Sequence, residues 1–333
     1  MTQPGRRRAL VMPFWLFLLA AASAAALLFG RYPSPGFMDP GLIAVDPMAL
    51  RVITMIRLPR VLGALLVGAA LGASGAAMQF VFANPLVDAG FLGVSQGASF
   101  GAALVLALGG SGLALFGSSF AFALLALAMS VAMSGRVRFG GAVLRLLLSG
   151  IAVSAFFSAL VAMIKYGADP MGTLPEITYW LMGGLSGATW KALALAAPIA
   201  LTAVATLVAL RWRIALLSLD EATAASLGAR PALERAAILF AAAAAVAAVT
   251  AMAGVVGWVG LIVPHLARVA LRGDGAPTVP GAAIIGALFV VVCDAVARGV
   301  FPGELPLGVT TSLLGTVAFF VLVAARRVRV ERG

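Results

Sequence analysis

The chain has 333 residues, of which 62% are hydrophobic and 11% charged, and its formal net charge is +11. Soluble domains carry roughly 25% charged residues, so this sequence has too few polar side chains to cover a soluble protein of its length. Disorder is excluded as well, because disordered chains are poor in Leu, Val and Phe. The composition favours an integral membrane protein over a soluble enzyme, a nucleic-acid-binding protein or a disulfide scaffold.

The apolar segments predict nine or ten membrane-spanning helices, because each span needs about 20 mostly apolar residues. The stretch from Arg235 to Leu271 is ambiguous, since it forms either one long helix or a full span and a short one broken near Gly254, Gly257 and Gly260. We expect the first apolar run to be a span and not a cleaved signal peptide, because no small-residue cleavage site is evident. The other spans are expected at residues 10–30, 61–82, 142–166, 192–210, 279–297 and 307–325, with two more between 88 and 136 that turn at 109–112.

Arginine clusters between the apolar runs favour ten spans. Cytoplasmic loops carry an excess of Lys and Arg, and ten spans place 16 of the 23 basic residues at cytoplasmic ends. Nine spans would put the C-terminal arginines outside. We therefore expect an all-α integral membrane protein with both termini cytoplasmic, forming one domain over residues 1–333 with short tails at 1–9 and 326–333. The cytoplasmic clusters lie at residues 6–8, 136–145, 211–235, 268–272 and 326–332.

The connection at residues 218–230 has the pattern of a short capped helix. Ser218 and Glu221 have the spacing of a capping box, Gly228 is a natural left-handed stop, and Pro231 suits the first turn of the next helix. A slim helix of about residues 220–227 on the cytoplasmic side could fit a groove on a cytosolic partner. A simple helical linker explains the same pattern.

Three arginines do not follow the cytoplasmic bias. Arg57 and Arg60 stand at the start of the second span, and Arg298 stands at the outer end of the ninth. The guanidinium fork pairs well with carboxylates, so outward arginines suit docking of an acidic partner. Anchoring to lipid phosphates is the alternative for each of them.

Residues needed for other mechanisms are scarce. The two lysines, Lys165 and Lys191, do not lie in a phosphate-binding Gly-rich loop, so the chain has no P-loop with which to hydrolyse ATP. One histidine, His265, and one cysteine, Cys293, give no His-cluster metal site and no internal disulfide. Asp294 and His265 are the clearest ionisable residues within spans, and neither belongs to a chain of acids for proton coupling. We expect Asp294 to lie near a helix end or to cap a neighbour, and His265 to satisfy backbone opened by Pro264.

Motifs along nearly the whole chain resemble those of the FecCD-type permeases, subunits of ABC importers for iron–siderophore complexes, haem and cobalamin. They include Arg57-Leu-Pro-Arg60, Asn84-Pro-Leu86 and Leu217-Ser-Leu-Asp-Glu221, followed by Gly257-Trp-Val-Gly-Leu-Ile-Val-Pro-His-Leu-Ala-Arg268 and Gly303-Glu-Leu-Pro-Leu-Gly-Val309. The resemblance implies ten spans, with a short eighth span that carries Pro264 and His265. It also implies a homodimer, two cytosolic ATPase subunits that bind ATP and Mg, and a periplasmic binding protein.

The resemblance assigns roles to three groups of residues. It implies that Arg57, Arg60 and Arg298 dock the binding protein and that Asn84, Pro85 and Leu86 form a cytoplasmic gate. A plain helix C-cap before proline is the alternative for Asn84. The coupling element gripped by the ATPase would contain Ser218, Asp220, Glu221, Ala224, Leu227 and Gly228.

We therefore expect a multi-pass permease of the bacterial inner membrane that imports an iron–siderophore complex by ATP-driven alternating access. It would not be an enzyme, and would bind no cofactor, no metal and no nucleic acid itself. Haem and cobalamin are the near alternatives, and an oxyanion is a more distant one. An ion-coupled secondary transporter is the alternative of another class, although it would need more intramembrane carboxylates than Asp294 alone.

Overall fold

The computed structural model describes residues 11–219, 221–299 and 303–325, and over these ranges most of the chain is helical. Within them the β-structure is one hairpin of two short strands, in which β1 (Phe29–Gly30) pairs antiparallel with β2 (Gly36–Phe37). The long helices are α2 (Val11–Leu28), α5 (Leu58–Val81), α6 (Val94–Ala107), α7 (Gly112–Ser134), α8 (Ala142–Gly167), α10 (Trp190–Ala209), α13 (Pro231–Ala253), α14 (Val259–Leu271), α15 (Thr278–Gly299) and α16 (Leu307–Ala324). The short elements are α3 (Leu42–Val45), α4 (Pro47–Arg51), η1 (Val52–Arg57), η2 (Ala89–Leu92), α9 (Thr173–Leu181), α11 (Arg211–Leu216) and α12 (Glu221–Ser226).

The ten long helices lie where the spans were expected. Among the described residues, eight helices are long and apolar enough to cross a membrane, and the shorter apolar helices α6 and α14 take the remaining two places. The all-α membrane fold is therefore confirmed. The second span differs from its predicted start, because it begins at Leu58 and continues a helix that starts at Pro47.

The join within this long helix has a local cause. Pro59 has no N–H to donate and its ring crowds the preceding turn of helix. The turn before it, Val52–Arg57, widens into a π-helix and so keeps the helix continuous. The proline thus shifts the register of the helix without ending it.

The ambiguous region is a full span followed by a short one. Helix α13 ends at Ala253, and both Gly254 and Trp258 have φ of 68°, which breaks the helix before α14 begins. Helix α14 has 13 residues, about 20 Å at 1.5 Å per residue, which is less than the roughly 30 Å of a bilayer core. The break falls at the glycines that the sequence singles out.

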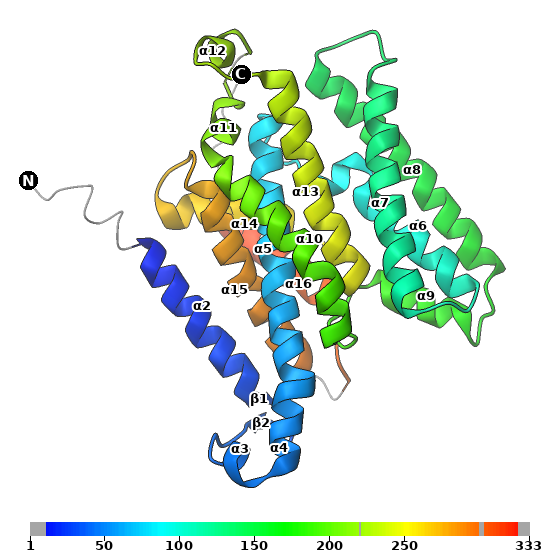
Figure 1. Ribbon diagram of the computed structural model, residues 1–333, viewed down its shortest axis with the longest axis vertical. Helices are drawn as coiled ribbons and strands as arrows, with labels where there is room; N and C mark the ends of the chain where they lie inside the picture. The colour runs from blue at the N-terminus through cyan, green and yellow to red at the C-terminus, as the bar shows by residue number, and fades with distance from the viewer. Residues whose placement is uncertain (1–10, 220, 300–302, 326–333) are drawn as a thin grey trace, which may run out of the picture.

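Helix α5 is the centre of the bundle, and 20 of its 24 residues are buried. It packs against α10, α13, α14 and α15 (Figure 1). A Cβ atom on Gly68 would overlap the carbonyl oxygen of Gly286 in α15, and one on Gly75 would overlap that of Gly260 in α14. Small residues let membrane helices approach this closely, so the glycines of α5 fix the spacing of the core.

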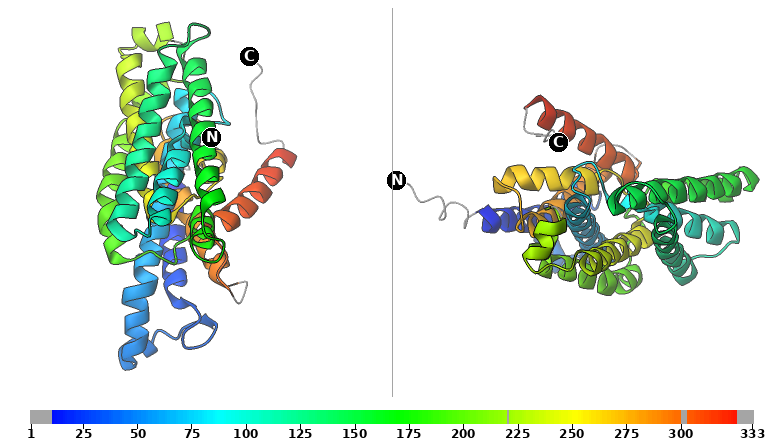
Figure 2. Two further views of the ribbon diagram at one scale, coloured as in Figure 1. Left: turned by 90° about the vertical axis from the view of Figure 1, so that its right-hand side faces the viewer. Right: turned by 90° about the horizontal axis from the view of Figure 1, so that it is seen from above.

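The two ends of the bundle differ in their connections. Helices α11 and α12 lie at one end, and the hairpin with α3 and α4 lies at the other (Figure 1). The α12 end carries the basic clusters of the connections at 135–141 and 211–235, so it is the cytoplasmic end under the positive-inside rule. Seen from that end, α16 lies on the opposite side of the bundle from α13 (Figure 2).

Candidate functional site

The three arginines expected to dock a partner lie together at the periplasmic end. Arg57 ends η1, Arg60 lies in the first turn of α5, and Arg298 lies in the last turn of α15. Only 4% of Arg57 and 7% each of Arg60 and Arg298 is exposed. They do not extend outward toward a partner or toward lipid, but turn into the space between α2, α5 and α15.

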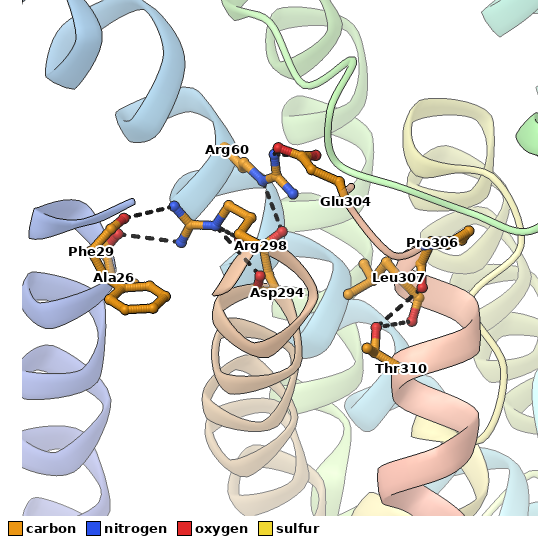
Figure 3. Close-up of polar contacts among 9 residues, drawn as sticks. All are labelled: Ala26, Phe29, Arg60, Asp294, Arg298, Glu304, Pro306, Leu307 and Thr310. Carbon is orange, nitrogen blue, oxygen red and sulfur yellow. Dashed lines mark hydrogen bonds and ion pairs between the residues drawn. The ribbon is translucent and has the colours of Figure 1, made fainter. Parts of the chain in front are cut away.

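Arg60 is held by two carboxylates (Figure 3). Its Nε donates to Oδ1 of Asp294 over 2.8 Å, and its Nη1 lies 3.0 and 2.9 Å from the two carboxylate oxygens of Glu304. Asp294 also pairs with Arg298, whose Nε lies 3.0 Å from Oδ2. Asp294 thus joins two buried arginines, while Glu304, with 37% of its side chain exposed, closes the cluster from outside.

Arg57 and Arg298 also cap the C-terminal end of α2. The last carbonyl groups of a helix have no partner within it and carry partial negative charge, so cations are favoured there. Arg298 donates to the carbonyl oxygens of Ala26 and Phe29 at 3.3 and 3.0 Å. Arg57 donates to those of Leu27, Leu28 and Tyr32 at 3.0, 2.8 and 2.9 Å.

This cluster changes the physical basis of the docking prediction. Removing a charged side chain from water is costly, and partners within the protein offset that cost. All three arginines have such partners, so their first role is to join α2, α5 and α15. A docking role stays a prediction. Glu304 is the exposed member of the cluster, so a partner would reach Arg60 from the side that Glu304 covers.

The coupling segment is a six-residue helix, α12, at the cytoplasmic end. Ala224 is fully buried, whereas 56% of Leu227 is exposed. Asp220 and the side chain of Glu221 lie outside the described residues. The surface that this segment offers to a partner therefore includes Leu227, which directly follows α12, but not Ala224.

The turns on either side of α12 are defined by Ser218 and Gly228. Gly228 has φ of 82°, which confirms the predicted left-handed stop, and its carbonyl oxygen accepts from Arg213 at 2.9 Å. The Ser218 hydroxyl donates to the carbonyl oxygen of Ala215 over 2.8 Å, which places it at the end of α11. The capping box of Ser218 and Glu221 stays a prediction, because the side chain of Glu221 lies outside the described residues.

The predicted gate residues form a tight turn after α5. Asn84 Oδ1 accepts from the backbone N–H of Leu86 at 2.9 Å, and the Asn84 N–H donates to the Gln79 carbonyl oxygen at 3.1 Å. This is the local capping geometry of the alternative interpretation. Leu86 is 52% exposed, so it projects from the turn and is the residue most able to contact another surface. The gate itself stays a prediction.

Helix α14 holds this turn in place. His265 Nε2 lies 3.1 Å from the carbonyl oxygen of Pro85, 180 residues away in the sequence. Arg268 donates to Gln79 Oε1 over 2.7 Å and lies over the ring of Phe80. His265 therefore bonds to the backbone of the turn at 84–86, and not, as expected, to backbone opened by Pro264.

The sequence did not reveal Glu304, Gln79 or Arg268 as parts of these sites. One signal was available for Asp294, because it precedes Arg298 by four residues and side chains at that spacing share a helix face. Glu304 and Gln79 meet their partners through tertiary packing alone. Within the described ranges, no three His, Cys, Asp or Glu side chains are grouped so as to hold a metal ion.

The ion-pair cluster predicts unequal effects of two isosteric substitutions. Asp294→Asn removes the charge between two buried arginines and should lower the free energy of unfolding by about 3–5 kcal/mol, the usual cost of breaking a buried pair. Glu304→Gln removes a partly exposed charge and should cost no more than about 1 kcal/mol. Denaturant unfolding of the detergent-solubilised protein checks both, and equal losses would show that Asp294 is not the central residue.

Comparisons with known proteins agree with this architecture. The FecCD transport family matches residues 16–325. The molybdate import system permease protein of Haemophilus influenzae is 37% identical over 92% of this chain and 93% of its own length. A protein of Helicobacter pylori described as a probable iron chelatin transport system permease is 41% identical over 83% of both chains.

A solved structure shows the same fold. An ABC transporter assigned to the metal-chelate type, in an inward-facing conformation, superposes with a TM-score of 0.87. The two sequences are 36% identical, and the match covers 95% of this chain and 99% of the chain in the solved structure. The family match, the close relatives and the ten apolar helices agree, and together they define a multi-pass protein of the bacterial inner membrane. The chain belongs to the FecCD transport family and is the permease subunit of an ABC importer.

Proposed function

We propose that this permease imports iron–siderophore complexes, as one of two identical permease subunits working with two cytosolic ATPases and a periplasmic binding protein. The 41% identity to the iron chelatin permease of Helicobacter pylori carries the substrate class. Haem and cobalamin are bulky metal chelates and remain alternatives within the same class.

Molybdate is a second candidate, favoured by a specific observation. The molybdate permease of Haemophilus influenzae aligns over 315 residues, a longer match than the 276 residues of the iron chelatin permease. An oxyanion and an iron chelate differ greatly in size, so a direct transport assay separates them.

The packing of the core supports a pathway between two copies of the chain. Helices α5 and α15 touch through the backbones of Gly68 and Gly286, and α5 and α14 touch through Gly75 and Gly260. These contacts leave no room between the helices for a chelate. A substrate would therefore pass along an outer face of the bundle, which a second copy would close.

The cytoplasmic end supports coupling to a separate ATPase. The sequence contains no Gly-x-x-x-x-Gly-Lys motif, so we assign ATP and Mg to the partner subunits and no cofactor to this chain. Helix α12 contacts α13, which packs along α5, and α5 leads into the turn at Asn84–Leu86. Movement of α12 on ATP binding would reach the gate through these packed helices and shift the balance between two states of the pathway.

At the opposite end, the cluster around Arg60 supports docking of an acidic binding protein. Arg57, Arg60 and Arg298 outnumber Asp294 and Glu304, so the cluster keeps a net positive charge. Glu304 occupies Nη1 of Arg60 from the exposed side. A carboxylate of the binding protein would compete with Glu304 for this position.

Reconstituted transport tests the substrate. The permease with its ATPase and binding protein, in liposomes containing ATP, should take up radiolabelled iron–siderophore but not molybdate. Uptake of molybdate alone would transfer the assignment to the second candidate. Uptake without ATP, driven by a proton or sodium gradient, would contradict ATP-driven import of either substrate.

Leu227→Asp tests the coupling helix. If Leu227 is buried by the ATPase, its loss removes about 1.5–3 kcal/mol of apolar burial and should weaken association roughly ten- to a hundredfold. Affinity between the purified permease and its ATPase measures the effect. Phe139→Asp is the matched control, since Phe139 is 64% exposed on another cytoplasmic connection. Equal affinities for the two variants would show that α12 is a linker.

Glu304→Gln tests docking while leaving Arg60 its bond to Asp294. Freeing Nη1 of Arg60 should tighten binding of the binding protein about two- to fivefold, which corresponds to about 0.5–1 kcal/mol for a partly exposed ion pair. The gain should shrink at high salt, where charges are screened. Asp39→Asn is the control, because it removes the same charge from an exposed loop at this end without touching Arg60. The same gain in both variants would indicate net charge as the cause, and weaker binding by Glu304→Gln would contradict the competition.

A further inference from the structure

The turn at Asn84–Leu86 is joined to α14 through Gln79, in the last turn of α5. The backbone carbonyl oxygen of Gln79 accepts from the N–H of Asn84 at 3.1 Å. Its side-chain amide donates to the carbonyl oxygen of Leu261 at 3.1 Å and accepts from Nη1 of Arg268 at 2.7 Å. Only 3% of Gln79 is exposed, so the loss of either side-chain bond would leave a polar atom buried without a partner.

Arg268 is oriented by contacts on three sides. Its Nη1 donates to Gln79, its guanidinium carbon lies 5.5 Å from the centre of the Phe80 ring, and its Nε lies 3.1 Å from Oδ2 of Asp274. A free arginine side chain samples many rotamers. The ion pair at Nε therefore favours the rotamer that presents Nη1 to Gln79.

Asp274 lies in the connection between α14 and α15, and its two carboxylate oxygens have separate partners. Oδ1 accepts from the N–H of Gly275 at 2.9 Å and from the hydroxyl of Thr278 at 3.3 Å, whereas Oδ2 faces Arg268. The Asp274 side chain is 58% exposed and that of Arg268 is 19% exposed. A continuous series of contacts thus leads from an exposed carboxylate at the cytoplasmic end of α15 to the buried base of the turn that follows α5.

We propose that Asp274 is a positioning residue for the cytoplasmic gate, acting through Arg268 and Gln79 to hold the turn at Asn84–Leu86 against α14. This inference rests on the gate proposed for that turn. His265, which bonds to the same turn, precedes Arg268 by three residues, so both side chains project from one face of α14. The alternative role of Asp274 is to close its own loop, and that role uses Oδ1 alone.

Asp274→Asn separates the two roles, because an amide oxygen can still accept from Gly275 and Thr278 while the charge facing Arg268 is lost. Amide hydrogen exchange of the detergent-solubilised permease should become about two- to fivefold faster over residues 79–88, as expected for loss of a partly exposed ion pair, and stay unchanged over α10. Asp274→Glu keeps the carboxylate and should keep exchange slow. Glu234→Gln is the matched control, because it removes a carboxylate that pairs with Arg213 at 3.4 Å and does not reach the turn.

Gln79→Leu tests whether the contacts form one series. It should accelerate exchange over residues 79–88 at least as much as Asp274→Asn does, and adding Asp274→Asn to it should have no further effect. A further acceleration in the double variant would overturn the proposal. So would unchanged exchange in Asp274→Asn, or equal acceleration over residues 79–88 and over α10, which would indicate a general loss of stability.

Transport distinguishes failure of this inference from failure of the gate. In liposomes with the ATPase and the binding protein, Asp274→Asn should lower the substrate moved per ATP hydrolysed by about two- to fivefold, in proportion to the loosening of the turn. The probe is radiolabelled iron–siderophore or molybdate, whichever the wild-type importer takes up. An unchanged ratio together with faster local exchange would show that Asp274 holds the turn but that the turn is not the gate, which overturns the proposed gate.

Discussion

The close approach of backbones around α5 is the constraint on which the rest of this permease depends. Water does not drive helices together within a bilayer, so association relies on packing and on polar contacts between helices. At Gly68 and Gly75, helix α5 meets α15 and α14 with no side chain between them. The ten long helices of the described residues thereby pack into one body, and α5 runs through its centre from the periplasmic end to the cytoplasmic end.

Polar contacts at the two ends of α5 fix its position further, in addition to the glycine contacts along its length. At the periplasmic end, Arg60 joins α5 to α15 through Asp294. At the cytoplasmic end, Gln79 joins it to α14 through Arg268. Each contact links segments about 190 or more residues apart in the chain. The helix therefore has fixed orientation as well as fixed spacing, and displacement of one end is transmitted with little bending to the other.

The parts predictable from the sequence were those that depend on local pattern. Apolar length located the spans, and Gly254 and Gly228 marked helix ends, because a membrane span and a left-handed turn each require particular residues nearby. The positions of Arg57, Arg60 and Arg298 were not predictable in the same way. Their departure from the positive-inside rule correctly showed that something other than topology retains them. The spacing of four residues could have paired Arg298 with Asp294, but the partners of Arg60 and Arg57 are Asp294, Glu304 and carbonyl groups at the end of α2, which only the tertiary fold brings close to them.

The uninterrupted helix from Pro47 to Val81 has a mechanical consequence. Its 35 residues extend about 50 Å, whereas the hydrocarbon core of a bilayer is about 30 Å thick. Since its cytoplasmic end is fixed beside α14, the excess projects into the periplasm as a stalk that begins with α4 and lies beside the β1–β2 hairpin (Figure 1). Because the stalk and α5 form one helix, a force applied to the stalk in the periplasm would reach the packed core of the membrane domain directly, without passing through a flexible loop.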